Sequence, residues 1–202
     1  DIGLNIDALP PQVSIDEGRL ELLYLGRLSV EKGVDVLIDA CGLLEKEGVD
    51  FRLRICGDGP ERNSLEDQIN ALGRRTQIEF MGYMRRNELG GLYRSAHVVC
   101  VPSRSDSLPT VVLEALISGT PIVGSDVGGI PFMIDDGETG FIVEKENARN
   151  LFDRLRFLDK CRSCIEPMRC SCMEIGRTKY SWYKTGSALS KQILIRLRIK
   201  GA

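Results

Sequence analysis

The sequence predicts an α/β fold: a parallel sheet of about six strands with helices on both faces. Two observations carry this prediction. Short apolar runs alternate with longer segments of helical periodicity. The order of strand and then helix repeats along the chain to about residue 160, which is typical of parallel sheets covered by helices. Ligands of such sheets bind beyond the carboxyl ends of the strands, so we expect the functional residues in the strand-to-helix loops.

The predicted strands are short and apolar. The clearest is the second, in which Phe51, Leu53 and Ile55 alternate with two arginines at the two-residue period of a strand. The predicted strands cover residues 22–25, 51–55, 78–81, 98–101, 121–123 and 141–143.

The predicted helices lie between these strands. Val34, Ile38 and Cys41 fall on one face of the first helix, and Leu65 and Ile69 share a face of the second. Further helices are predicted around 89–93, 111–117 and 151–158.

Three stretches of the chain differ in character. Residues 1–18 are a linker or the start of a domain, because the segment from Asn5 to Pro10 is polar and carries proline. Residues 19–160 form the strand-and-helix domain, and residues 161–202 form carboxyl-terminal helices. These helices pack on the domain or dock on something outside the chain. The positions with helical spacing there are Trp182, Gly186, Leu189, Ile193 and Leu197.

Composition excludes several classes of function. The chain has 202 residues, 43% hydrophobic and 28% charged, with a net charge of -2, so nucleic acid is disfavoured as the main partner. No apolar run is long enough for a membrane span, and the amino end lacks the features of a signal peptide. The single histidine, His97, makes a self-contained Ser-His-Asp triad an unlikely mechanism and predicts a structural or surface role for the ring.

The seven cysteines predict a reducing compartment, because their number is odd and three of them lie in apolar periodic segments. A second group has a spacing that a zinc site could use, although no common zinc module matches it. We expect free thiols on a helical tail instead. This group is Cys161, Cys164, Cys170 and Cys172.

The first two strand-to-helix loops carry glycine and charge. Gly26 permits close backbone approach, and Arg27 and Lys32 can converge on an anion at the amino end of a helix. The alternative is a solvated turn with ordinary surface cations. The second loop, from Gly57 to Pro60, nearly matches the dinucleotide fingerprint, but Arg62 occupies the third glycine position.

The loop after the fourth predicted strand is the richest in candidate chemistry. Pro109 suits a first helical position, and the free N–H groups after it would form an anion cradle. Asp106 lies in the loop. Glu114 lies in an otherwise apolar stretch, where a carboxylate is costly to bury unless it binds something. The alternative is an exposed glutamate on an amphipathic helix.

The last two loops contain paired glycine or turn signals. Gly128 and Gly129 follow a strand and would again allow a ligand close to the backbone. The segment 136–140 is interpreted as a structural turn into the last strand.

These loops, taken together and in this order, resemble the retaining nucleotide-sugar glycosyltransferases of group 1 (family 4). The matching motifs are Gly26-Arg27-Leu28 with Glu31-Lys32-Gly33, Gly57-Asp58-Gly59-Pro60, Pro102-Ser103, an acid-x7-Glu motif, Gly119-x-Pro121, Val127-Gly128-Gly129-Ile130-Pro131 and Asp136-Gly137-x-Thr139-Gly140. The resemblance runs from about Asn5 to Phe157, with Tyr180-Ser181-Trp182 beyond it. It implies a three-layer, Rossmann-like, donor-binding domain, the carboxyl-terminal half of a GT-B architecture.

The resemblance also implies roles for individual residues. Arg27 and Lys32 would hold the donor diphosphate and act in catalysis with Asp106, which would lie near the transferred sugar. Glu114 would bond the ribose hydroxyls. The remaining donor-binding residues that it implies are Gly26, Gly57, Tyr83, Met84, Ser107, Leu108, Pro109, Thr110 and Val111.

The implied partners are a UDP-, GDP- or ADP-linked sugar and an acceptor sugar or lipid-linked glycan, the acceptor being held by an amino-terminal domain that this chain lacks. No cofactor and no metal are expected, because the cations and a helix amino end replace a metal. The expected location is the cytoplasm. The cationic tail is a solvated helix face or, alternatively, a contact with the cytoplasmic face of a membrane. Its cations are Lys184, Lys191, Arg196, Arg198 and Lys200.

Three departures from the family pattern keep alternatives open. Asp106 is shorter than the usual glutamate, Ser107-Leu108 replaces an aromatic-glycine pair, and Phe132 stands where glutamate is usual. A non-catalytic nucleotide-sugar-binding or scaffold domain is therefore one alternative. A Rossmann oxidoreductase is a second, and the missing third glycine argues against it.

Overall fold

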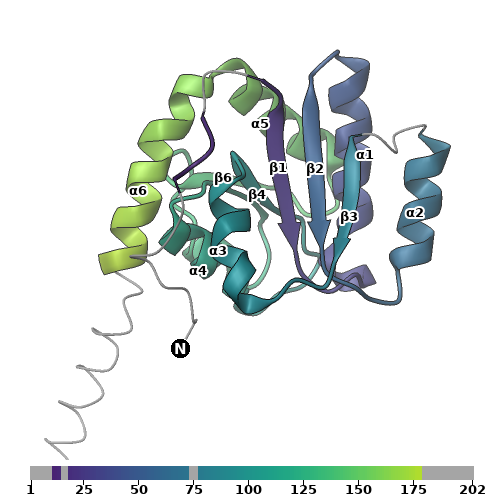
Figure 1. Cartoon of the computed structure of the whole chain (residues 1–202), viewed down its shortest axis with the longest axis horizontal. Coiled ribbons are helices and arrows are strands. Elements are labelled where there is room, and N and C mark those ends of the chain that lie inside the picture. Colours follow the sequence, from purple (N-terminus) through teal and green to yellow (C-terminus); the bar gives the residue numbers. More distant parts are fainter. Residues whose placement is uncertain (1–10, 15–17, 73–76, 179–202) are drawn as a thin grey trace, which may run out of the picture.

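The computed structural model describes residues 11–14, 18–72 and 77–178, which form one six-stranded parallel sheet with helices on both faces (Figure 1). The strand order is β3-β2-β1-β4-β5-β6, and every neighbouring pair is parallel. This confirms the predicted fold class. The strands are β1 Leu20–Leu25, β2 Phe51–Cys56, β3 Ile78–Gly82, β4 Val98–Val101, β5 Ile122–Ser125 and β6 Gly140–Val143.

The helices divide between the two faces of the sheet. Side chains of α1, α2 and α5 pack into one apolar core, and those of α3 and α4 pack into a second. The bounds are α1 Val34–Lys46, α2 Arg62–Ala71, α3 Arg86–Arg94, α4 Thr110–Ser118, α5 Ala148–Lys160 and α6 Ile165–Thr178, with the short 3-10 turns η2 Val30–Lys32, η3 Ile130–Phe132 and η4 Arg162–Cys164.

The strands are continuously apolar because both of their faces are covered. Along β4, Val98 and Cys100 enter the core beside α1 and α5, whereas Val99 and Val101 enter the core beside α3 and α4. Burying an aliphatic side chain contributes about 1.5–3 kcal/mol relative to leaving it exposed. Alternate residues of one strand therefore stabilise both layers of helices at once.

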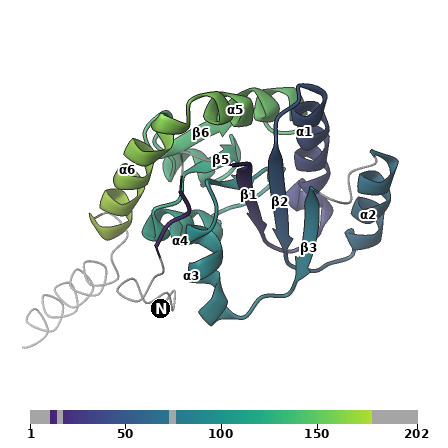
Figure 2. The same ribbon diagram turned by 45° about the horizontal axis from the view of Figure 1, so that its top comes forward.

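Helix α6 joins the two cores. It runs past the β6 edge of the sheet (Figures 1 and 2). Ile165 and Met168, in its first turns, pack into the core beside α5, and Cys172 packs into the core beside α4. A Cβ at Gly176 would lie 2.9 Å from the Ile117 backbone, so α6 packs directly on the α4 main chain. The described part of the predicted carboxyl-terminal stretch thus packs on the domain.

Some predictions concern residues outside the described ranges. They include most of the predicted linker, the aromatic-Ser-Trp segment 180–182, the helical positions 182–197 and the cationic tail. Within the described ranges, no helix is long and apolar enough to cross a membrane.

The sheet order reverses beside β1, which pairs with β2 on one side and with β4 on the other. The chain moves outward from β1 in one direction first and crosses over to β4 afterwards. At such a reversal the loops after the two central strands lead away from each other and leave a crevice between them. The loops after β1 and β4, residues 26–33 and 102–109, flank this crevice.

The prediction of four free thiols in the second cysteine group is wrong for two of them. Cys161 and Cys164 form a disulfide, because the η4 turn brings their Cα atoms to 5.4 Å, within the range that a disulfide spans. The other five cysteines are free, and of these only Cys170 is exposed. In the described part of the chain, no group of three or more His, Cys, Asp or Glu side chains could hold a metal ion.

His97 has a structural role in the fold and is not a surface residue. The residue is 1% exposed. The Glu21 N–H donates to Nδ1 at 2.9 Å, and Nε2 lies 2.8 Å from the Ser14 carbonyl oxygen, so the network assigns the proton to Nε2. Burial is the main cause that lowers the pKa of His97, and the nearby charges of Arg162 and Arg169 lower it further. The neutral ring thus ties the amino end of β4 to that of β1.

Alkylation can test the cysteine assignment. Under denaturing, non-reducing conditions we expect five reactive thiols by mass spectrometry, because one pair is bonded. The variant Cys161→Ser should gain one reactive thiol relative to the wild type, since it frees Cys164. Seven reactive thiols in the unreduced wild type would contradict the assignment.

Buried, neutral His97 predicts a loss of stability in mild acid. Its folded pKa is lowered, so the unfolded chain takes up a proton first as the pH falls below about 6.5, and the free energy of unfolding decreases. The midpoint of urea unfolding should be lower at about pH 5.5 than at about pH 7.5. His97→Gln, whose amide can replace both hydrogen bonds, should reduce that difference. An equal difference in the variant would assign the acid sensitivity to other groups.

Candidate functional site

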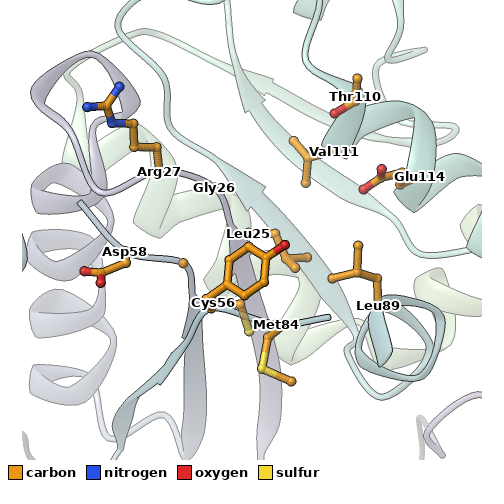
Figure 3. A pocket seen from close by; sticks show the side chains of 12 residues that line it. Leu25, Gly26, Arg27, Cys56, Asp58, Met84, Leu89, Thr110, Val111 and Glu114 are labelled. Carbon is orange, nitrogen blue, oxygen red and sulfur yellow. The ribbon is translucent and has the colours of Figure 1, made fainter. Parts of the chain in front are cut away.

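A cavity of about 380 Å³ opens at the carboxyl ends of β1 and β2 (Figure 3). Its walls come from the loops after β1, β2 and β3 and from helices α3 and α4. The lining residues are Leu25, Gly26, Arg27, Cys56, Gly57, Asp58, Tyr83, Met84, Leu89, Thr110, Val111 and Glu114.

One face of α4 supplies the polar side of this cavity. Val112, Ala115 and Leu116 turn into the core. The helical period therefore places Thr110 and Glu114, four residues apart, on the opposite face (Figure 3). Of the two alternatives for Glu114, the structure supports a place in the site, because the carboxylate lines the cavity and is not simply an exposed surface group.

The amino end of α4 is suited to an anion. Thr110 is the first helical residue and Pro109 is the N-cap, one position before the place that was predicted for Pro109. Pro109 provides no side-chain hydrogen bond to the first turn. Thr110 and Val111 line the cavity, so the positive end of the α4 dipole lies at its edge.

Lys32 and Asp106 form an ion pair beside the cavity. The Lys32 Nζ lies 2.5 Å from Asp106 Oδ2, and the two side chains are 28% and 13% exposed. The pair joins the η2 turn to the loop after β4. It therefore fixes the position of the lysine cation, while Arg27 is exposed at the rim of the cavity.

The predicted site residues fall into two groups. Those that line the cavity are Gly26, Arg27, Gly57, Tyr83, Met84, Thr110, Val111 and Glu114. Lys32, Asp106, Ser107, Leu108 and Pro109 belong to neighbouring segments and do not line it. Phe132 is 77% exposed at the end of η3.

The opposite wall of the cavity is apolar. It is built from Leu25, Cys56, Met84 and Leu89, and Tyr83 is 85% exposed at its edge. Burial raises the pKa of Cys56 to about 11, so its thiol stays neutral and belongs to this wall. Leu25, Cys56 and Leu89 could not be predicted as site residues, because each has the apolar pattern of a core position.

Two glycines allow neighbouring loops to approach each other more closely than a side chain would permit. Gly57 has φ 141°, and a Cβ there would lie 1.9 Å from the Gly26 carbonyl oxygen. A Cβ at Gly128 would lie 1.8 Å from the Asp106 carbonyl oxygen. The backbone of Asp106 and Ser107 fills the space where a Cβ of Gly128 or Gly129 would lie, so these glycines allow two loops to approach each other closely. That they also allow a ligand close to the backbone stays a prediction.

Arg104 ties together the loops that flank the crevice. Its guanidinium donates to both carboxylate oxygens of Asp35 at 2.8 and 2.6 Å, to the Val30 carbonyl oxygen at 2.7 Å and to Glu146 at 2.9 Å. The hydrogen bonds to Arg104 are the main cause that lowers the pKa of Asp35. This set of contacts, the Arg104 clamp, could not be predicted from the sequence, because Arg104 and its partners are far apart along the chain.

The arrangement can hold a ligand with three unlike parts. A flat or apolar group fits the wall formed by Leu25, Met84 and Leu89. Hydroxyl groups can donate to the Glu114 carboxylate, and an anion can contact the amino end of α4.

Comparisons of sequence agree with this arrangement. The family model described as "Glycosyl transferases group 1" matches residues 5–178. The alpha-D-kanosaminyltransferase of Streptomyces kanamyceticus is 32% identical over 84% of this chain and 44% of its own length. The D-inositol 3-phosphate glycosyltransferase of Corynebacterium aurimucosum is 36% identical over 82% of this chain and 41% of its own length. The chain spans less than half the length of these relatives.

Solved structures share the fold. HepE from Anabaena in complex with UDP-glucose has a TM-score of 0.80 at 19% identity, over 87% of this chain and 49% of that one. The C-terminal domain of a glycosyl transferase group 1 family protein from Francisella tularensis has a TM-score of 0.77 at 23% identity, over 89% of this chain and 100% of that one. The prediction of a Rossmann-like, carboxyl-terminal GT-B domain is therefore confirmed.

The Arg104 clamp can be tested by measuring stability. Arg104→Met should lower the free energy of unfolding by about 1 kcal/mol, because it removes several charge-assisted hydrogen bonds whose carboxylate partners are partly exposed. Urea unfolding measures this change. A matched control is Arg52→Met, whose partner Glu79 is 48% exposed. The control should change the free energy of unfolding by less than about 0.5 kcal/mol. Equal effects in both variants would show that Arg104 is an ordinary surface arginine.

Proposed function

Because the chain belongs to the group 1 glycosyl transferases, we propose that its cavity binds a nucleoside-diphosphate sugar as the donor for sugar transfer. The observation that carries this proposal is the Glu114 carboxylate, which reaches the cavity beside the amino end of α4. The two relatives are named as glycosyltransferases, and HepE was crystallised with UDP-glucose. A donor with a flat base, a ribose and a diphosphate matches the three parts of the cavity.

Each part of the donor has a proposed place. The nucleobase lies near Gly57, against Met84 and beside Tyr83. The ribose hydroxyls donate to Glu114. The diphosphate contacts the first N–H groups of α4 together with Arg27 and Lys32, and these cations supply the charge that a metal would otherwise provide.

We propose that the reaction is the retaining transfer of a hexose. The bond that breaks joins the anomeric carbon to an oxygen of the β-phosphate. The bond that forms joins the same carbon to an acceptor oxygen on the same face of the sugar, and the acceptor proton leaves with the phosphate. Arg27, Lys32 and the α4 amino end stabilise the charge that develops on the leaving diphosphate. Asp106, which forms an ion pair with Lys32, lies near the transferred sugar in this proposal.

The acceptor, a sugar or lipid-linked glycan, is proposed to bind outside this chain. This agrees with the share of the relatives that the chain covers, 44% and 41%. The cytoplasmic location and the contact with a membrane surface stay predictions.

Calorimetry tests donor binding. We expect one or more of UDP, GDP and ADP, and the corresponding nucleotide sugar, to bind. Glu114→Ala should weaken binding by roughly tenfold or more, because it removes a charged acceptor for the ribose hydroxyls. The control Glu174→Ala removes an exposed glutamate of α6 and should leave the affinity unchanged.

Two outcomes would count against the proposal. Absence of binding of all these nucleotides at about millimolar concentration would exclude a donor site, since it corresponds to less than about 4 kcal/mol of binding free energy. Unchanged affinity in Glu114→Ala would exclude the ribose role, even if a nucleotide binds.

A further inference from the structure

Behind the Glu114 carboxylate lies a buried phenol that the proposed function does not use. The Tyr93 hydroxyl donates to Glu114 Oε2 at 2.6 Å. Tyr93 belongs to α3 and Glu114 to α4, and the two residues are 21 positions apart in the sequence. Glu114 therefore lines the cavity (Figure 3) and at the same time accepts a hydrogen bond from the Tyr93 hydroxyl.

The Tyr93 ring is held in place by the core. It is 0% exposed, and it packs among the apolar side chains of β4, α4 and β5. Its backbone is held as well, because the Thr120 hydroxyl donates to the Tyr93 carbonyl oxygen at 2.9 Å in a buried position. The phenolic oxygen consequently has little freedom to move away from the carboxylate.

The chemistry of the pair gives the hydrogen bond one direction. An ionised carboxylate only accepts hydrogen bonds, so the phenol must be the donor. Burial and the neighbouring charge of Glu114 raise the pKa of Tyr93 well above its usual value, which keeps the phenol protonated. A carboxylate offers about four acceptor positions, and Tyr93 uses one of them.

We propose that Tyr93 is a positioning residue for ribose recognition. Its buried hydroxyl orients the Glu114 carboxylate toward the 2′- and 3′-hydroxyls of the donor nucleotide. This rests on the function proposed above. An acceptor that is already oriented loses less conformational freedom when a ligand binds, so the effect of Tyr93 appears in the affinity for ribose and not in the affinity for other parts of the ligand.

Ribose discrimination in Tyr93→Phe tests the role directly. The probes are whichever of UDP, GDP and ADP binds best, and its 2′,3′-dideoxy counterpart (the deoxynucleotide), which lacks both hydroxyls. Tyr93→Phe should weaken binding of the ribonucleotide by roughly fivefold to tenfold while leaving the deoxynucleotide within about twofold, so the ratio of the two dissociation constants falls. An unchanged ratio would overturn the proposal.

A double-mutant cycle separates positioning from general destabilisation. In the Glu114→Ala background, Tyr93→Phe should have no further effect on nucleotide affinity, because there is no carboxylate left to orient. An equal effect in both backgrounds would overturn the proposal. The control Thr139→Val removes another fully buried hydroxyl, in the turn before β6 and outside the cavity lining. It should lower the free energy of unfolding without changing the ratio of the dissociation constants of the ribonucleotide and the deoxynucleotide.

A second measurement needs no folded Tyr93 variant. In protein labelled with 13C at the tyrosine Cζ atoms, Glu114→Gln identifies the Tyr93 signal as the one that shifts most. Adding the ribonucleotide to the wild type should move this signal, and adding the deoxynucleotide should move it less. Equal shifts would contradict the proposal. Absence of any nucleotide binding would instead contradict the donor site itself, so the two failures can be told apart.

Discussion

Two loops that lead away from each other at the reversal of strand order must be held together for this site to exist. The parallel sheet creates the crevice at that point, but the strands themselves do not hold the two loops in fixed positions on either side of it. Arg104 makes the connection by donating to Asp35 and to the Val30 carbonyl oxygen across the gap. The ion pair of Lys32 with Asp106 is a second link between the same two loops. These contacts hold Lys32 in a fixed position relative to the amino end of α4. A site that acts through preorganised charge requires such fixed positions.

The sequence predicted those features of the fold that depend on local pattern. Strands such as β4 are apolar throughout because both faces are buried, and that pattern is visible without a structure. Glu114 could be identified for the opposite reason, since a carboxylate in an apolar helix has to be accounted for. Pro109 lies at the N-cap, one position before the predicted one, where the φ of about −65° that its ring imposes agrees with the observed φ of −70°.

Features that depend on distant partners could not be predicted. Tyr93 has the pattern of an ordinary core residue, and its role appears only when α3 and α4 lie side by side. Gly128 and Gly129 signal close backbone approach, but the pattern does not say whether a ligand or another loop approaches. The prediction of free thiols at Cys161 and Cys164 was wrong, because the spacing of the two residues does not show that the η4 turn brings them together.

Helix α6 has a consequence for how the domain unfolds. Its first turns belong to one apolar core and Cys172 belongs to the other, while Gly176 brings its backbone against α4. Neither layer of helices can then separate from the sheet without disturbing this shared helix. We therefore expect the two layers to form a single cooperative unit, in which the cavity and the far edge of the sheet lose their structure in one transition.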